Sequence, residues 1–152
     1  MSNGADTQEF LSAFDAFAQA VRRARGAPAL AGQDALTLSQ YALIQGLAES
    51  DCARVVELAA DAGVTASTAT RILDVLERRG IVRRRRTPED RRSVLVSLTD
   101  SGRDVLRARH EWQRQIERSF YSGLPETERE LAPDLLLRLA ALIDQLAAGP
   151  EG

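Results

Sequence analysis

The chain has 152 residues, of which 44% are apolar and 28% are charged, with a formal net charge of −2. This length fits one domain or two closely joined ones, and no apolar run approaches the roughly 18 residues of a membrane span. With one Cys, one His and no glycine-rich phosphate loop, the sequence excludes an internal disulfide and predicts no metal, no cofactor and no enzyme.

The first predicted helix covers residues 7–25, after a frayed terminus at residues 1–6. Apolar side chains recur along it at helical spacing and form one stripe for packing, made of Phe10, Phe14, Phe17 and Val21. Gly26 ends this helix, and residues 26–36 are expected to form a loop.

A second helix is predicted from Leu38 to about Glu49. Thr37 and Gln40 form a capping-box pattern, in which each side chain satisfies the backbone N–H of the other residue, so the helix begins there. Its apolar positions recur at helical spacing and define an inner stripe, made of Tyr41, Ile44, Leu47 and Ala48.

The next segment has the pattern of a helix-turn-helix. A turn at residues 50–53 and a brief strand at Arg54–Val55 lead into a short helix at 57–62, which Gly63 ends. A longer helix follows at 66–79. In this pattern the second helix is presented to the major groove of DNA.

This second helix, from Ala66 to Arg79, contains no Pro or Gly and has Thr65 as its N-cap. A buried stripe is predicted, made of Ala69, Ile72, Leu73 and Leu76. The outer face carries polar side chains, which are Ser67, Thr68, Thr70, Arg71, Asp74 and Arg78. Gly80 lies just past the last apolar position, where helices most often end.

Positive charge is concentrated on this helix and on the segment that follows it. Residues 71–92 contain nine Arg and four acidic residues, a local charge of +5, so the rest of the chain sums to −7. An acidic chain with such a basic segment has the electrostatic footprint of a nucleic-acid binder.

The basic segment is predicted to fold as a β-hairpin. Residues 87–90 supply turn chemistry, and the alternation of apolar residues over 94–98 is typical of a strand. Because alternate residues of a strand point to opposite faces, only two of Arg83–Arg86 can face DNA together. The others are expected to pair with acids such as Glu77 or Asp100.

Two helices complete the chain. The first begins at a cap on Thr99 or Asp100 and reaches about Tyr121, and the last covers residues 126–148. A leucine stripe runs along the last helix, made of Leu131, Leu135, Leu139, Leu142 and Leu146. Leu136, Leu137, Ala140 and Ile143 widen this stripe beyond what one face of a small monomer needs, so together with the first helix it predicts a dimer arm. Pro133 lacks a backbone N–H and should kink or break the last helix.

Three stretches resemble the MarR family of bacterial transcription regulators: LTLSQYALIQGLAE, ELAADAGVTASTATRILDVLERRGIV and RTPEDRRSVLVSLTDSG. The last is the most specific, because it joins an Asp-x-Arg wing tip to a strand and a Leu-Thr-x-x-Gly pattern. The resemblance implies a mainly α fold, in which a winged helix-turn-helix with a small antiparallel β-hairpin wing lies between N- and C-terminal helical dimerisation arms. It implies a DNA-binding lobe at 37–98 and one intertwined dimerisation region of 7–26 and 99–148.

The resemblance also implies an obligate homodimer on a palindromic operator, with the recognition helix at Thr65–Arg79. Asp90 and Arg92 take the family's wing-tip positions, with Arg92 in the minor groove and Asp90 holding either the hairpin tip or the guanidinium. The expected DNA-binding residues are Thr65, Ser67, Thr68, Thr70, Arg71, Arg86, Asp90, Arg91 and Arg92. Val56 stands where the family usually has a Ser or Thr helix cap, so the first helix of the motif is expected to fray.

Several residues have both a structural and a functional interpretation. An effector pocket between the arms and the lobe is predicted for a small phenolic or amphipathic ligand, with Phe17, Tyr41 and Trp112 as candidates. For Tyr41 and Trp112, core packing is the favoured interpretation and the pocket is the alternative. A surface or pocket-lining role is favoured over metal binding for His110, and Cys52 is favoured as a packed or idle thiol over a redox sensor.

Two classes of function fit these patterns. The first is a dimeric, sequence-specific DNA-binding transcriptional regulator, expected to be a repressor that a small aromatic effector releases. The alternative is a winged-helix protein-interaction module, which has no need for Arg91 and Arg92 beside a Thr-rich helix. The N-terminus lacks the basic-then-apolar pattern of a signal peptide, so a cytoplasmic protein is expected. Neither the operator nor the effector follows from the sequence.

Overall fold

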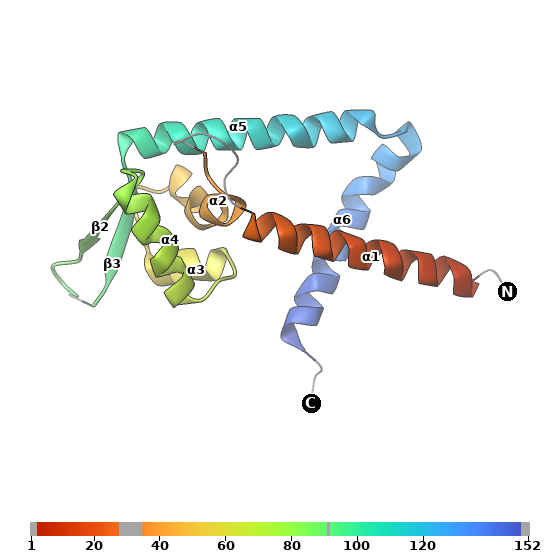
Figure 1. Ribbon diagram of the computed structural model, residues 1–152, viewed down its shortest axis with the longest axis horizontal. Helices are drawn as coiled ribbons and strands as arrows, with labels where there is room; N and C mark the ends of the chain where they lie inside the picture. The colour runs from red at the N-terminus through yellow and green to blue at the C-terminus, as the bar shows by residue number, and fades with distance from the viewer. Residues whose placement is uncertain (1–2, 28–34, 91, 150–152) are drawn as a thin grey trace. The chain divides into compact units, whose positions relative to one another are not determined.

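The computed structural model describes residues 3–27, 35–90 and 92–149. Over these residues the chain forms two compact units, which lie within 1–110 and 111–152 (Figure 1). Most of the predicted loop at 26–36 lies outside the described residues, as does Arg91 of the predicted DNA-binding set. None of the described helices is long and apolar enough to cross a membrane.

The order of helices and strands confirms the predicted winged helix. The first unit contains α1 (Asn3–Gly26), α2 (Leu38–Ile44), the 3-10 helix η1 (Gln45–Ala48), β1 (Ala53–Arg54), α3 (Val55–Asp61), α4 (Ala66–Arg78), β2 (Val82–Arg86) and β3 (Val94–Leu98). α5 (Asp100–Gly123) begins in this unit and continues into the second, which also holds α6 (Glu126–Ala148). The fold is therefore mainly helical with one small antiparallel sheet.

α1 begins earlier than the sequence predicts. It starts at Asn3, so the prediction of a frayed terminus is wrong for residues 3–6. Asp6 lies in the first turn, where an acidic side chain interacts favourably with the positive end of the helix dipole. The predicted apolar stripe is present, but Phe17 on it is 54% exposed.

α2 begins at the predicted capping box. Thr37 Oγ1 accepts the backbone N–H of Gln40 at 3.1 Å, and the Gln40 side chain accepts the N–H of Thr37 at 3.0 Å. The predicted helix to Glu49 is shorter in the structure, because its last turn, Gln45–Ala48, is a 3-10 helix.

α3 begins before the predicted position. The Glu57 carboxylate accepts the backbone N–H of Arg54 at 2.9 Å, so the helix starts at Val55 and the strand before it ends at Arg54. Val56 therefore lies inside the helix rather than at its cap, and the expected fraying stays a prediction. Glu57, in the third helical position, accepts the N–H of the capping residue Arg54, but among the described residues no side chain takes the place of the Ser or Thr hydroxyl, which would accept an N–H of the first turn.

The described strands form one antiparallel sheet in the order β1-β3-β2. In the hairpin, Val82 pairs with Leu98 and Arg84 with Val96. β2 lies at the edge of the sheet, so the N–H groups on its outer side need partners outside the sheet.

The core of the first unit joins the sheet to α2, α3 and α4. Its largest fully buried side chains are Leu43, Ile44, Leu47, Leu73, Leu76, Val82 and Val96. The predicted stripe of α4 is confirmed, with Ile72 partly buried and its other members buried. Gly63 and Gly80 have φ of 64° and 71°, a backbone conformation that glycine adopts without a steric cost, and each lies where the sequence predicts a helix end.

α6, in the second unit, differs from the helices of the core. It is one helix through Pro133, so the predicted break does not occur there. Proline removes only one backbone hydrogen bond, and the Leu and Ala residues around it are strong helix formers. α6 buries none of its residues, and Leu131 and Leu146 are 68% and 60% exposed.

Candidate nucleic-acid interface

The first turn of α4 presents a cluster of hydroxyl groups. Thr65 Oγ1 accepts the backbone N–H of Thr68 at 3.2 Å, and it lies 3.0 Å from Thr68 Oγ1 and 3.1 Å from Ser67 Oγ. Thr65 and Ser67 are exposed, whereas Thr68 is half-buried. The cap thus holds these hydroxyls at the exposed N-terminal end of a helix, where the dipole also favours a phosphate oxygen.

The next turn of α4 carries Thr70 and Arg71. Thr70 Oγ1 donates to the carbonyl of Ala66 at 2.9 Å, so its hydroxyl is satisfied within the helix and its methyl group remains for contact. Arg71 is exposed, and none of the described residues forms a hydrogen bond or ion pair with its guanidinium. A free guanidinium at this position can bind a phosphate or a guanine edge.

Asp90 organises the tip of the wing, the hairpin of β2 and β3. Its Oδ1 accepts the backbone N–H of Arg92 at 2.9 Å, and its Oδ2 accepts the Ser93 hydroxyl at 2.8 Å. Thr87 Oγ1 donates to the Asp90 carbonyl at 2.6 Å and accepts the Asp90 N–H at 3.2 Å. The Arg92 N–H and the Ser93 hydroxyl together lower the pKa of Asp90. Asp90 therefore holds the hairpin tip rather than the guanidinium.

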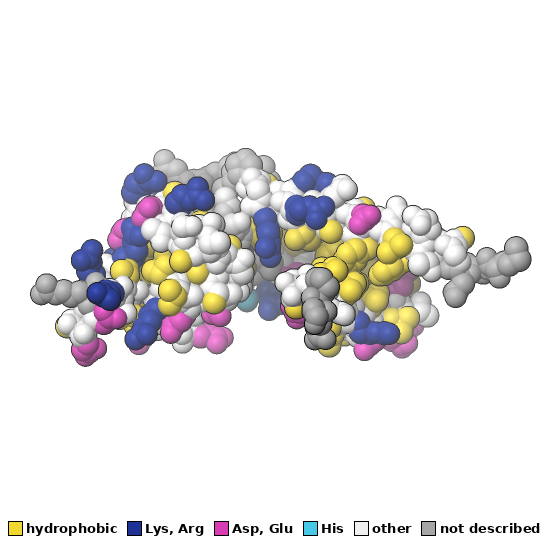
Figure 2. All heavy atoms as spheres, turned by 90° about the horizontal axis from the view of Figure 1, so that it is seen from below, with side chains coloured by type: hydrophobic (Ala, Val, Ile, Leu, Met, Phe, Trp, Pro, Cys, Tyr) yellow, Lys and Arg dark blue, Asp and Glu magenta, His cyan; other side chains and the backbone are white. Residues whose placement is uncertain are grey.

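Arginine side chains cover much of the wing. Those that are exposed, and that have no partner among the described residues, are Arg83, Arg85, Arg86 and Arg92. Figure 2 shows arginine side chains, with acidic ones among them, on the end of the molecule that holds the hairpin. Arg86 shares a face of β2 with Arg84, while Arg83 and Arg85 lie on the other face.

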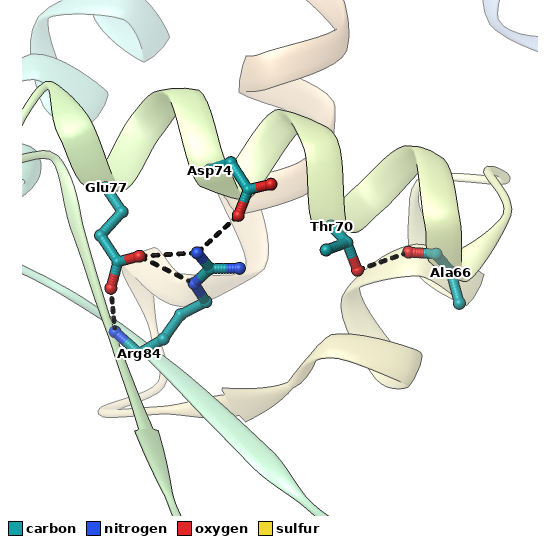
Figure 3. A network of polar contacts seen from close by, with 5 residues as sticks. All are labelled: Ala66, Thr70, Asp74, Glu77 and Arg84. Atoms are coloured by element: carbon teal, nitrogen blue, oxygen red, sulfur yellow. Dashed lines mark hydrogen bonds and ion pairs between the residues drawn. The ribbon is translucent and has the colours of Figure 1, made fainter.

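Arg84 joins the wing to α4 (Figure 3). Its Nη2 lies 2.6 Å from Asp74 Oδ1 and 2.6 Å from Glu77 Oε2, and its Nε donates to Glu77 Oε2 at 3.0 Å. Its backbone N–H donates to Glu77 Oε1 at 3.3 Å. The hydrogen bond from Arg84 is the main cause that lowers the pKa of Glu77. The predicted pairing of one wing arginine with Glu77 is present, and Asp74 is a second partner that the sequence analysis missed.

The other end of the hairpin is fixed to α5 by the Leu-Thr-x-x-Gly segment. Thr99 Oγ1 donates to the Gly80 carbonyl at 2.5 Å and accepts the N–H of Gly102 at 2.9 Å, so Thr99 is the predicted cap. The Thr99 N–H donates to the Ile81 carbonyl at 3.0 Å. A Cβ on Gly102 would lie 1.9 Å from that carbonyl oxygen, so only glycine fits there.

A cavity of about 470 Å³ lies in the first unit, beside η1 and the first half of α5. Its polar lining includes Tyr41, Gln45, Glu49, Arg103, Arg107 and His110. The Tyr41 hydroxyl lies 2.7 Å from His110 Nδ1, and Tyr41 is also a core residue, 4% exposed. Arg103 is half-buried, and its guanidinium has no hydrogen bond or ion pair within the described ranges.

The other predicted pocket candidates are not among the lining residues of this cavity. Phe17 and Trp112 do not line this cavity, and both are more than half-exposed, so core packing is wrong for Trp112. Cys52 is exposed rather than packed. In the part of the chain that the structure describes, no group of His, Cys, Asp and Glu could hold a metal ion. Arg103 is a lining residue that the sequence analysis missed, because its helix showed only a sparse apolar pattern.

Known proteins share these features. A sequence profile of the MarR family matches residues 36–94, which span α2 to the start of β3. The HTH-type transcriptional regulator YdgJ of Bacillus subtilis (strain 168) is 30% identical over 113 residues, which are 74% of this chain and 69% of YdgJ. The chain belongs to the MarR family. It is thus a transcriptional regulator with a DNA-binding winged helix, and not an enzyme.

Two solved MarR-type structures show what such folds bind. A mutant of MarR from Escherichia coli, in complex with operator DNA, is 28% identical, with a TM-score of 0.59 over 68% of this chain and 75% of that one. PcaV from Streptomyces coelicolor, in complex with its natural ligand, is also 28% identical, with a TM-score of 0.60 over 70% of this chain and 75% of that one. MarR-family regulators therefore include both DNA-bound and ligand-bound members.

Proposed function

We propose that this protein is a homodimeric transcriptional repressor that binds an inverted-repeat operator. The observation that supports the proposal is that the first unit exposes both the polar N-terminal half of α4 and the arginine-rich wing, which this proposal assigns to DNA binding. Residues 37–98 form the DNA-binding lobe, and residues 7–26 with 99–148 form the dimerisation region. Repression follows if the bound dimer covers promoter DNA.

The recognition helix enters the major groove in this proposal. Ser67, Thr68 and Arg71 reach base edges and phosphates, and the methyl group of Thr70 meets a thymine methyl. Arg71 pairs with the O6 and N7 atoms of a guanine, the contact that a free guanidinium makes best. Thr65 binds a phosphate at the helix N-terminus.

The wing binds the flanking minor groove. Arg92 inserts there, and Arg86 and Arg91 contact the backbone beside it. A narrow A·T-rich minor groove has the strongest negative potential, so the wing favours A·T flanks without reading an exact sequence. Asp90 supports this contact through the hydrogen bonds that hold the hairpin tip.

The dimer sets the spacing of the two half-sites. The exposed leucines of α6 and the exposed aromatic residues of α1 supply apolar surface for a second copy of the chain. A two-fold dimer places its recognition helices about one helical turn apart, so half-sites centred roughly 10 base pairs apart are expected.

Selection from a random duplex library gives the operator, and a salt series on that operator then tests the proposal. Arg71→Ala should cost about 1–3 kcal/mol of binding free energy and relax the preference at one position per half-site. Arg92→Ala should weaken binding to all sites and remove the preference for A·T flanks. Binding should fall steeply with salt, because each neutralised phosphate releases counterion. Wild-type affinity in both variants would contradict the assignment.

We also propose that a small phenolic or amphipathic acid releases the protein from DNA. The cavity beside Tyr41 supports this proposal, because it combines apolar walls with Arg103, whose guanidinium suits a carboxylate. A ligand that prefers the DNA-free conformation shifts the population toward it without touching DNA. A screen of phenolic acids should find one that lowers operator affinity in the wild type but not in Arg103→Ala. If none changes the affinity at millimolar concentration, this part of the proposal fails.

A further inference from the structure

Two carboxylates lie on the face of α4 to which we assigned DNA binding above. Asp74 and Glu77 follow Thr70 at helical spacing, one and two turns further along the same face (Figure 3). Carboxylates next to a phosphate backbone repel it. Both of these groups are bound by Arg84 of the wing, whose side chain is only 23% exposed.

The contacts with Glu77 fix the backbone of β2 as well as the side chain of Arg84. Oε2 of Glu77 accepts hydrogen bonds from the guanidinium of Arg84, and Oε1 of Glu77 accepts one from the backbone N–H of Arg84. That N–H is on the outer edge of β2, where the sheet offers it no partner. Glu77 therefore fixes both the backbone and the side chain of Arg84, and through them the base of the wing, against α4.

We propose that Arg84 is a positioning residue for DNA binding. Together with Asp74 and Glu77 it fixes the angle between α4 and the wing, so that Arg71 and Arg92 reach their two grooves at the same time. This inference rests on the proposed roles of the recognition helix and the wing. In this proposal Arg84 itself does not contact DNA.

Arg85 provides a matched control. It is the next residue of β2, exposed on the opposite face, and removing it deletes the same charge from the same strand. Arg84→Ala should weaken operator binding about tenfold or more, the loss expected when one aligned arginine contact fails. Arg85→Ala should weaken it about threefold or less, as for a solvated surface charge. Thermal unfolding of both variants should stay within a few degrees of the wild type.

Combining Arg84→Ala or Arg85→Ala with Arg92→Ala distinguishes a positioning role of Arg84 from a general effect on folding or on charge. In the R84A background, Arg92→Ala should have little further effect, because the wing is no longer held over the minor groove. In the R85A background it should keep its full effect. Arg71→Ala should keep its full effect in both backgrounds, because α4 is held by the core.

The double variant D74A/E77A separates positioning from charge neutralisation. If Arg84 only cancels the two carboxylates, this variant should bind operator more tightly, since it removes two negative charges from the interface. The positioning role instead predicts weaker binding, with the preference for A·T flanks reduced as in R84A.

Each outcome decides between the alternatives. Equal binding by R84A and R85A, a full effect of Arg92→Ala in the R84A background, or tighter binding by D74A/E77A overturns the positioning role and leaves the proposed function intact. A wild-type protein that selects no duplex at all overturns the proposed function and, with it, this inference.

Discussion

The two units of the chain differ in how far the apolar faces of their helices are buried. In the first unit, side chains such as Leu73 and Leu76 are fully buried between α4, its neighbours and the sheet. In the second, α6 carries just as regular a leucine pattern but buries none of its residues. The periodicity of apolar residues alone therefore does not distinguish a helix that is buried in a core from a helix whose apolar face is exposed in the single chain.

The difference has an energetic meaning. Burying one leucine side chain contributes roughly 1.5–3 kcal/mol, so the first unit has already gained this free energy within a single chain. The exposed leucines of α6 would gain it only by association. We therefore expect changes in α4 to alter folding, and changes in α6 to alter assembly.

The largest expected effect is the loss of the dimer. Leu139→Arg with Leu142→Arg places two charges in the half-buried part of the α6 stripe, where an interface would have to desolvate them. Sedimentation should show a monomer, and operator binding should be lost. A dimer that survives these changes would show that α6 is not the interface.

A smaller effect separates core from interface. Leu73→Ala removes a fully buried side chain and should lower the free energy of unfolding by about 2–5 kcal/mol. Its matched partner is Leu135→Ala, at a position that is 52% exposed on α6, which should mainly raise the dimer dissociation constant. Denaturant unfolding and sedimentation of both variants measure the two effects. The comparison fails if Leu73→Ala weakens the dimer as much as Leu135→Ala does.

Gly102→Ala tests the close contact between α5 and the hairpin. Its Cβ would meet the Ile81 carbonyl, a backbone atom that cannot move aside easily, so we expect a loss of about 1–3 kcal/mol of stability. Gly123→Ala, at the other end of the same helix, meets no atom within 4 Å and should be nearly neutral. The denaturant midpoints of the two variants, compared with that of the wild type, measure this difference in stability.

The smallest expected effect is a pH dependence from Glu77. Because Arg84 lowers the folded-state pKa of Glu77 below its reference value of 4.5, the pair stabilises the fold above that pH. This contribution should be lost as the pH falls through the lowered pKa. Glu77→Gln should cost at most about 1 kcal/mol at neutral pH and nothing in strong acid. In the R84A background the same substitution should show no such pH dependence.

Local signals explain which parts of the fold the sequence predicts well. The capping box of Thr37 and Gln40, the cap at Thr65 and the turns at Gly63 and Gly80 depend on a few neighbouring residues, and each lies where it is predicted. The start of α3 is mispredicted by two residues, because Arg54 offers no hydroxyl cap signal and its N–H is bound instead by Glu57.

Tertiary placement explains what the sequence does not predict. Glu77 is a foreseeable partner for a wing arginine, but Asp74 becomes one only because the hairpin folds back along α4. In the same way, the cavity joins Tyr41 to Arg103, two residues on separate helices, while Phe17 and Trp112 lie outside its lining. Which aromatic residues share a pocket depends on packing between elements, and helical periodicity carries no information about that.

The hydrogen bonds at Thr99 couple the orientation of α5 to the orientation of the wing. Thr99 bonds to the carbonyls of Gly80 and Ile81, and Gly102 lets the first turn of α5 lie directly against them. α5 is continuous from this junction through the cavity-lining residues Arg103, Arg107 and His110, so a tilt of this part of the helix is transmitted to the base of β2. Because the hairpin extends from this junction, at the Val82–Leu98 pair, past the Arg86–Val94 pair to its tip, a small rotation at the base displaces the tip by more than the base.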